Sequence, residues 1–238
     1  MGDIISAMAR EQLYLNYRLE GKEPFHLIDA VKEFGFASLE EYFSAKREYE
    51  FSRLEFDVIE TAPERAISDV FAAISGQRTA VLFADTNDTI IWNGDNSEFN
   101  ESYCNECGIP VYPLQTGGGT IVSTNGDLNI GICIPGSVGA DERFLLSGLA
   151  DIFRKYTDKP VEVVGNDILV GGYKAIGSSS YRSNEMFVLI TPVSLSEKAE
   201  LISRICTKHS EKQPRHIDFM EAETLRMEVL RWLKAKSI

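Results

Sequence analysis

The chain has 238 residues, of which 44% are hydrophobic and 10% aromatic, enough for one good-sized globular domain or one domain with a small appendage. Its formal net charge is −12 and no lysine–arginine cluster appears, so nucleic acid and membrane surfaces are poor candidate partners. No apolar run could span a bilayer and no secretory signal is evident, so we expect a cytoplasmic protein with reduced cysteines.

The first part of the chain, residues 1 to about 55, has the pattern of charged helices. Helices are expected over residues 3–19 and 26–34, and a third should begin at Ser38 and run to about Arg53. Glu41 follows Ser38 by three residues, which is a capping-box pattern. The pattern changes near Phe56, so we divide the chain into an N-terminal helical segment, 1–55, and a main domain, 56–238.

The main domain alternates short strands with helices. Strands are expected over residues 56–59, 79–84, 89–92, 111–114, 120–123, 128–134, 161–164, 167–170, 173–177 and 186–193. Helices are expected over 63–74, from Asn96 to Cys107, over 139–156, from Ser194 or Ser196 to about 208, and over 218–234. Asn125–Gly126 predicts a hairpin-like pairing of 120–123 with 128–134 through a type I′ turn. This mixture indicates an α+β or mixed α/β domain.

A glycine-rich turn, Thr116–Gly117–Gly118–Gly119–Thr120, is the first candidate site. Three glycines without Cβ atoms allow positive φ and a close approach of the backbone to a ligand. The exposed N–H groups could then face an anion or a carbonyl oxygen. Taken alone, the triplet favours a tight connection between strands over a binding site.

The second candidate is the stretch from Asn166 and Asp167 to Gly177, which places Lys174 on the return strand of a tight hairpin. A lysine held on a rigid strand can neutralise a phosphate or polarise a carbonyl group. Taken alone, Lys174 has the pattern of an outward residue on an edge strand.

The order of these blocks resembles the lipoate-protein ligase and octanoyltransferase family. Residues 89–94, Asn100–Glu101 and Gly108–Pro110 resemble the segments that precede the glycines in that family. The blocks that follow the glycines are Gly126–Asn129 and the stretch around Lys174. The resemblance covers roughly residues 56 to 205.

The resemblance implies an α+β fold, with a mixed sheet flanked by helices as in biotin and lipoate ligases. It implies that lipoate or a similar acid is activated with ATP, with Mg²⁺ accompanying the nucleotide, and is passed to a lysine of a lipoyl-type carrier domain. Lys174 matches the reactive-site lysine. The resemblance further implies substrate-binding roles for Thr116, Gly117, Gly118, Gly119, Asn166, Asp167 and Gly177. Trp92 could border the acyl pocket, although an aromatic residue on a strand is more often core packing.

The chain departs from the family pattern just before the glycines. Pro113 and Leu114 occupy the places of an arginine pair that helps to bind phosphate, and Ser123 and Thr124 occupy those of a His–Asp pair. Three functions therefore stay open: an ATP-dependent ligase, an acyltransferase that uses no ATP, and a non-catalytic binding or scaffold module.

The remaining candidate groups are weaker. Cys104 and Cys107 form a CxxC pair without the second pair that a zinc site needs, and no metal site is expected. Cys133 lies in an apolar strand and has the pattern of a core residue rather than of a transferase nucleophile. The three histidines, His26, His209 and His216, show no metal-ligand spacing.

Overall fold

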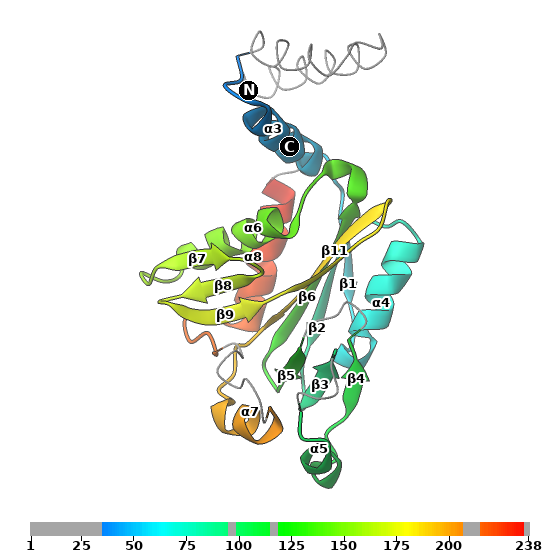
Figure 1. The fold of residues 1–238 in the computed structure, drawn as a ribbon, viewed down its shortest axis with the longest axis vertical. Coiled ribbons are helices and arrows are strands. Elements are labelled where there is room, and N and C mark those ends of the chain that lie inside the picture. The colour runs from blue at the N-terminus through cyan, green and yellow to red at the C-terminus, as the bar shows by residue number, and fades with distance from the viewer. Residues whose placement is uncertain (1–34, 95–98, 115–118, 207–214, 236–238) are drawn as a thin grey trace. The chain divides into compact units, whose positions relative to one another are not determined.

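A computed structural model describes residues 35–94, 99–114, 119–206 and 215–235. The chain divides into two compact units, Met1–Leu54 with Lys234–Ile238, and Glu55–Leu233 (Figure 1). The helices expected over 3–19 and 26–34 lie outside the described residues.

In the first unit, helix α3 covers Leu39–Ser52. Its cap follows the predicted pattern, because the Ser38 hydroxyl accepts the backbone N–H of Glu41 at 3.1 Å. The Glu41 carboxylate in turn accepts the backbone N–H of Ala37 at 2.6 Å. The third predicted helix is thus confirmed, together with its start at Ser38.

The second unit is built on an eight-stranded mixed sheet with the order β1-β2-β6-β11-β9-β8-β7, in which β10 also pairs with β11. The strands are β1 (Asp57–Glu60), β2 (Ala80–Asp85), β6 (Leu128–Pro135), β7 (Val161–Val164), β8 (Asp167–Val170), β9 (Tyr173–Gly177), β10 (Ser179–Arg182) and β11 (Met186–Val193). Strands β1 and β2 are parallel, and the other pairs are antiparallel. The central strands β2, β6 and β11 are almost continuously apolar and buried, so they form the core of the unit.

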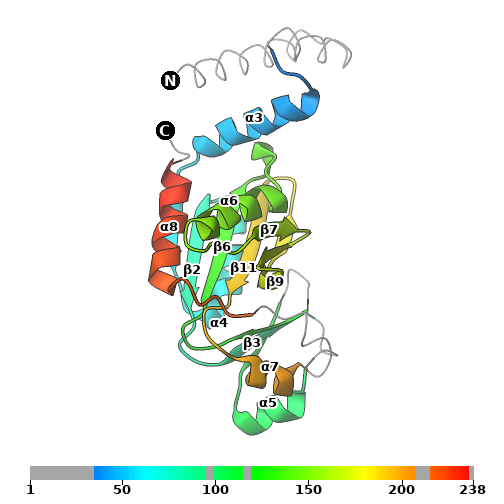
Figure 2. The same ribbon diagram turned by 90° about the vertical axis from the view of Figure 1, so that its left-hand side faces the viewer.

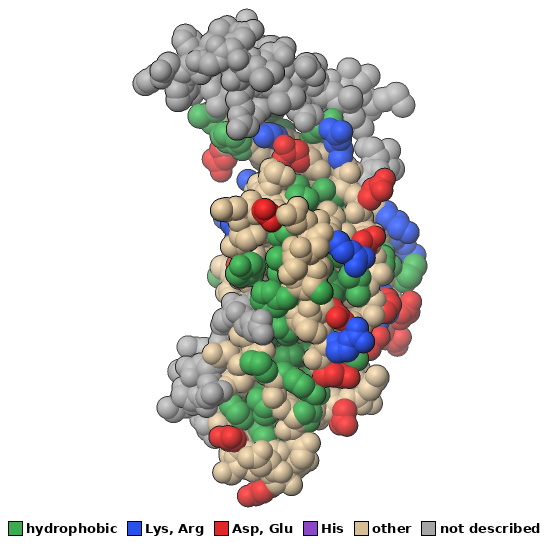
Figure 3. Space-filling model, turned by 90° about the vertical axis from the view of Figure 1, so that its right-hand side faces the viewer, with side chains coloured by type: hydrophobic (Ala, Val, Ile, Leu, Met, Phe, Trp, Pro, Cys, Tyr) green, Lys and Arg blue, Asp and Glu red, His purple; other side chains and the backbone are tan. Residues whose placement is uncertain are grey.

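A small sheet has the order β4-β3-β5, with β3 at Ile90–Asn93, β4 at Val111–Pro113 and β5 at Thr120–Ser123. In the lower half of Figure 3, at the height of this sheet in Figure 1, hydrophobic side chains gather at the surface. In the small sheet, Val111 of β4 is exposed, and Tyr112 and Ile121 are partly buried.

Helices cover both faces of the large sheet. Those on the large sheet are α4 (Pro63–Ser75), α6 (Glu142–Arg154) and α8 (Ala222–Ala235), with a 3₁₀ turn at Gly136–Val138. Helices α5 (Glu101–Cys107) and α7 (Ala199–Ile205) pack instead against the small sheet. Figures 1 and 2 show α6 and α8 side by side, with α4 on the other side of the sheet. The predicted α+β fold with a mixed sheet flanked by helices is confirmed.

The predicted pairing of 120–123 with 128–134 is wrong. Strand β5 pairs with β3 in the small sheet, whereas β6 pairs with β2 and β11 in the large one. Of these two residues only Gly126 has a positive φ, whereas a type I′ turn needs a positive φ at both, so Asn125–Gly126 is not such a turn. Instead, Gly126 donates its N–H to the Thr86 carbonyl at 2.9 Å, which holds the connection against the end of β2 rather than closing a hairpin.

Two predicted helix starts also differ. The cap of α5 is Asn100, whose side chain accepts the Tyr103 N–H at 3.1 Å, rather than Asn96, which lies outside the described residues. Helix α7 begins after Lys198, and neither Ser194 nor Ser196 caps it. The Ser196 hydroxyl is instead bonded to the Asp127 carboxylate at 2.9 Å. Strand β10 was not predicted. In the described part of the chain, no helix is both long and apolar enough to cross a membrane.

Candidate functional site

The β8–β9 hairpin holds Lys174 in place. Gly171 and Gly172 both have positive φ, which permits the tight turn that joins the two strands. The Lys174 ammonium lies 2.8 Å from the carboxylate of Asp167, and both side chains are about three-quarters buried (27% and 28% exposed). The lysine predicted from the sequence is therefore a positioned, partly desolvated cation on a strand.

Gly177 leaves the space that the Lys174 side chain occupies. It faces Asp167 across the ladder of β8 and β9. A Cβ atom at position 177 would lie 2.7 Å from Cε and 2.8 Å from Nζ of Lys174. Any larger residue there would displace the amine, which gives a physical reason for a glycine three residues after the lysine.

Lys174 lines a cavity of about 660 Å³. Its walls come from the loop before β7, from β9, from α7 and from the segment that leads to α8. Apolar side chains there include Ile202, Ile217 and Phe219, and cations include Lys159, Lys198 and Arg215. A cavity of this size with a few convergent charged groups is typical of a small-molecule site.

The segment after residue 214 contributes groups to this cavity that no sequence motif indicated. The Arg215 guanidinium lies 3.7 Å from the centre of the Tyr173 ring. His216 Nδ1 lies 2.6 Å from the Glu197 carboxylate. The N–H of Ala199, donated to that carboxylate, and the charge of His216 hold the pKa of Glu197 below its ordinary value. These residues come together only because distant segments meet at β9.

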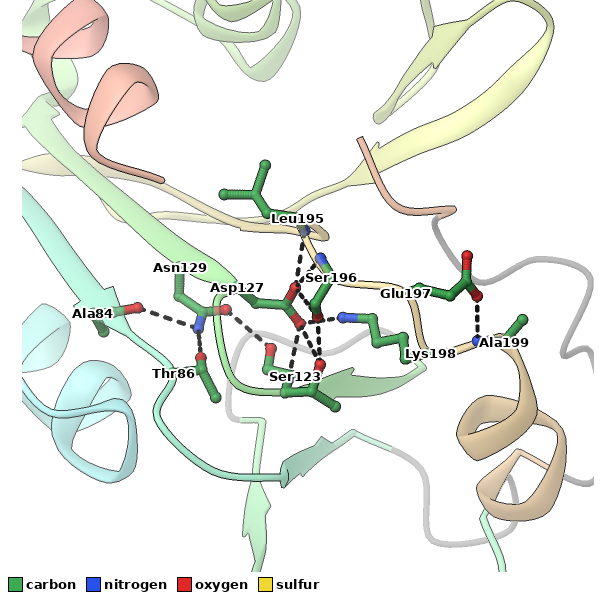
Figure 4. A network of polar contacts seen from close by, with 11 residues as sticks. Ala84, Thr86, Ser123, Asp127, Asn129, Leu195, Ser196, Glu197, Lys198 and Ala199 are labelled. Atoms are coloured by element: carbon green, nitrogen blue, oxygen red, sulfur yellow. Dashed lines mark hydrogen bonds and ion pairs between the residues drawn. The ribbon is translucent and has the colours of Figure 1, made fainter. Parts of the chain in front are cut away.

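A network around Asp127 holds the segment that precedes α7 (Figure 4). Asp127 follows β5 in the chain, and its carboxylate accepts the backbone N–H groups of Leu195 at 2.9 Å and Ser196 at 3.1 Å. It also accepts the N–H of Thr124 at 2.8 Å and forms an ion pair with Lys198. The connection after the glycine-rich turn and β5 is thereby tied to a wall of the cavity.

Lys198 is a structural rather than a free cation. Its side chain is 6% exposed and that of Asp127 is 1% exposed. Burial lowers the pKa of Lys198, and the charge and hydrogen bond of Asp127 oppose that shift. The charge of Lys198, the residue that precedes α7, is therefore neutralised within the protein by Asp127.

The glycine-rich turn is described only in part. Thr116, Gly117 and Gly118 lie outside the described residues, and Gly119 is exposed just before β5. Its carbonyl accepts the N–H of Gly94 at 3.4 Å. A cavity shared by this turn and Lys174 stays a prediction.

The other predicted positions are described. Asn166 is exposed in the turn before β8, and its side-chain amide donates to the Ser178 carbonyl at 3.0 Å. Trp92 is 3% exposed and belongs to the core cluster that also contains Val70 and Leu114, so it packs as a core aromatic residue. A role for it in binding substrate stays a prediction.

The four cysteines do not line the cavity. Cys107 is exposed, whereas Cys104, Cys133 and Cys206 are buried. Burial raises the pKa of the Cys133 thiol to about 12, so it is a poor nucleophile at neutral pH. In the described ranges, no group of three or more His, Cys, Asp or Glu side chains could hold a metal ion.

Comparison with known families decides the affiliation of the chain. Residues 66–230, which include the β8–β9 hairpin and Lys174, match the model of the lipoyl protein ligase A/B catalytic domain. The chain belongs to this family. No curated protein matched the sequence.

Solved structures share the fold of this lipoyl protein ligase A/B catalytic domain. Protein Ta0514 of T. acidophilum with bound lipoic acid is 17% identical, with a TM-score of 0.62 over 77% of this chain and 85% of that one. A lipoate-protein ligase A bound with ATP is 15% identical, with a TM-score of 0.64 over 77% and 85%. A bipartite lipoate protein ligase from Thermoplasma acidophilum, studied with its E2 lipoyl domain, is 16% identical, with a TM-score of 0.63 over 77% and 84%.

Within this family, the positions of the missing arginine pair have ordinary structural roles. Leu114 is 6% exposed and packs in the core cluster, and its N–H donates to the Asn93 carbonyl at 3.0 Å. Pro113 ends β4 and is exposed. Neither residue supplies a charge for a phosphate.

Proposed function

We propose that the chain activates lipoate, or a similar medium-chain acid, with ATP and transfers the acyl group to a lysine of a lipoyl-type carrier domain. The observation that carries this proposal is the Lys174 ammonium, which is fixed 2.8 Å from Asp167 in the wall of a cavity in a lipoyl ligase family chain. The family membership and the shared fold support an enzyme of the lipoate and biotin ligase kind.

The cavity suits an acid that has an apolar tail and an activated, anionic head. Ile202, Ile217 and Phe219 offer apolar surface, and burial of a methylene group contributes about 0.8 kcal/mol. Lys174 and Arg215 bring positive charge to the same cavity. The glycine-rich turn, with Thr116, Gly117, Gly118 and Gly119, would complete the acyl pocket, and Asn166, Asp167 and Trp92 would be further ligand contacts.

In the proposed reaction, the carboxylate of the acid attacks the α-phosphate of ATP and pyrophosphate leaves. The ε-amine of the acceptor lysine then attacks the acyl carbonyl, an amide bond forms, and AMP leaves with the bonding electrons. Negative charge develops on the carbonyl oxygen and on the departing phosphate. A preorganised cation such as Lys174 stabilises that charge by about 3 kcal/mol.

Solved relatives support the substrate class. One contains lipoic acid, one contains ATP, and one was studied with its lipoyl domain. By analogy we expect lipoate, MgATP and a lipoyl-type acceptor here. A cytoplasmic location, the absence of nucleic-acid and membrane partners, and the assignment of residues 56–238 as the catalytic domain stay predictions.

The test is intact-mass spectrometry of a lipoyl domain after incubation with the full chain, lipoate, ATP and Mg²⁺. We expect a mass increase of one lipoyl group, and a rate that falls about 100-fold or more in Lys174→Ala, the scale of losing one transition-state donor. Lys234→Ala, which changes an exposed lysine of α8 outside the cavity, is the matched control and should keep the wild-type rate.

The alternatives give different outcomes. Acylation of the domain from an acyl-carrier donor without ATP would indicate an acyltransferase. The buried cysteines and their absence from the cavity argue against the cysteine nucleophile that some transferases use. Binding of lipoyl-adenylate with no turnover, unchanged in Lys174→Ala, would indicate a binding or scaffold module.

A further inference from the structure

Arg215 is anchored to strand β9 twice. Its backbone N–H donates to the carbonyl of Lys174 at 2.8 Å, which adds the segment before α8 to the edge of the hairpin. Its guanidinium is stacked at 3.7 Å on the ring of Tyr173, the neighbour of Lys174. Although its side chain reaches the surface, it is held in one place by the backbone and by the ring, at the cavity that Lys174 also lines.

Each of the other strongly basic groups of the cavity has a carboxylate partner within ion-pair distance. Lys174 is paired with Asp167, Lys198 with Asp127, and Lys159 with Asp218 at 3.8 Å. Arg215 forms no ion pair with a carboxylate in the described ranges of the chain. Stacking uses the face of the guanidinium, whereas its N–H donors lie in the plane of the group, so the edge stays available to a ligand.

We propose that Arg215 binds a phosphate group of the nucleotide and takes the part that the arginine pair of the family would play. This inference rests on the proposed function. An arginine edge offers two parallel N–H donors that match two oxygens of a phosphate, a geometry that a lysine cannot supply. Leu114 is buried in the core and Pro113 has no charge, so neither can supply a cation to a phosphate. Arg215 brings it from a position about 100 residues further along the chain.

Equilibrium binding of a non-hydrolysable α,β-methylene analogue of ATP with Mg²⁺ to the full chain tests this assignment. We expect Arg215→Gln to raise the Kd of the analogue about 10- to 100-fold, the effect of losing one charge-assisted contact. The Kd of lipoate should change less than about twofold, because the acid is not the ligand of this group. Arg215→Lys should fall between the wild type and Arg215→Gln.

Two further variants separate the contact from its support. Tyr173→Leu removes the ring on which the guanidinium is stacked, so we expect weaker binding of the analogue, by about threefold to tenfold, a cation–π scale. Arg65→Gln removes an exposed arginine of α4 that does not line the cavity, and it should bind the analogue as the wild type does. Unchanged thermal unfolding of each variant excludes a loss of fold.

The outcomes distinguish this inference from the proposed function. If the wild type makes lipoyl-adenylate and Arg215→Gln binds the analogue as tightly, the inference is wrong and the function stands. If Arg215→Gln changes only the KM for the lipoyl domain, Arg215 contacts the acceptor and the phosphate assignment is overturned. If the wild type neither binds the analogue nor makes lipoyl-adenylate, both proposals fail.

Discussion

The carboxylate of Asp127 and the ammonium of Lys198 form a buried ion pair between residues that are 71 positions apart in the chain. The pair joins the connection after β5 to the segment that precedes α7, a wall of the cavity. Three backbone N–H groups also point at the same carboxylate, so the charge of Asp127 is supported from two parts of the chain.

Replacement of Lys198 by Met should lower the free energy of unfolding by about 3–5 kcal/mol, since it leaves the Asp127 carboxylate buried without its cation. Adding Asp127→Asn should recover part of the loss, because a neutral amide needs no counter-charge. Urea denaturation measures both changes.

The control for this pair is Arg78→Gln, which breaks an ion pair with Asp57 whose two side chains are about half exposed. Exposed pairs contribute about 0–1 kcal/mol, so its effect should be small. If Lys198→Met lowered the free energy of unfolding by less than about 1 kcal/mol, the buried pair would not be a stabilising contact.

Gly177→Ala should reduce activity while leaving stability nearly unchanged. The added Cβ would lie 2.7 Å from Cε of Lys174, the flexible end of a side chain, so the amine moves and the backbone need not. We expect kcat to fall about tenfold or more, which is less than the roughly 100-fold fall expected when one preorganised donor is removed completely. Acylation kinetics and thermal unfolding measure the two effects. Full activity in Gly177→Ala would show that the rate does not depend on this position of the Lys174 amine.

The control is Gly76→Ala at the end of α4, where a new Cβ would meet its neighbours no closer than 3.4 Å. It lies outside the cavity and should leave the rate of acylation as it is in the wild type.

Gly148→Ala should destabilise the protein even though alanine favours helices by about 1 kcal/mol. Gly148 lies in α6, and a Cβ there would meet ring atoms of Trp232 in α8 at 2.1 Å and 2.3 Å. We expect a net loss of about 1–3 kcal/mol from overpacking, measured by urea denaturation. In a Trp232→Leu background the same change should cost much less, and equal costs in both backgrounds would refute the steric reason.

In the native protein at pH 8, one thiol should react fast with a reagent that modifies exposed cysteines. Cys107 is exposed, whereas the other three cysteines are buried. Burial raises the pKa of Cys133 to about 12, so little thiolate is present. Cys107→Ala should abolish the fast phase. Rapid labelling of Cys133 in folded protein, detected by mass spectrometry of peptides, would show that the core is open.

The raised pKa of the buried Cys133 thiol also predicts that the stability of the protein depends on pH. Between ~8.5, the ordinary pKa of a cysteine, and about 12, the unfolded chain loses a proton that folded Cys133 keeps. The free energy of unfolding should therefore decrease as pH rises through this range, by up to ~1.4 kcal/mol per pH unit from this group. Cys133→Ala should have a shallower slope than the wild type, with Cys107→Ala as control. Equal slopes in Cys133→Ala and the wild type would contradict it.

Local chemistry in the sequence was sufficient for most elements and for the hairpin that carries Lys174, whereas the site role of Lys174 came from the family resemblance and stays a prediction. Gly171 and Gly172 specify a tight turn, and this turn places Lys174 opposite β8 within a few residues, so the pairing with Asp167 is a local consequence. The cap at Ser38 and the left-handed Gly108 after α5 follow from equally local preferences. Short, continuous apolar runs were enough to place the buried strands β2, β6 and β11.

Only the tertiary structure decided which strands pair and which distant groups share the cavity. The Asn125–Gly126 signal predicted a hairpin, but hydrogen bonds to Thr86 and the burial of Asp127 hold the two flanking strands in different sheets. Arg215 carries no motif, and it reaches Tyr173 because its backbone pairs with the carbonyl of Lys174. Turns and caps depend on a few neighbouring residues, whereas sheet order and cavity walls depend on which apolar surfaces bury one another, which no short stretch of sequence contains.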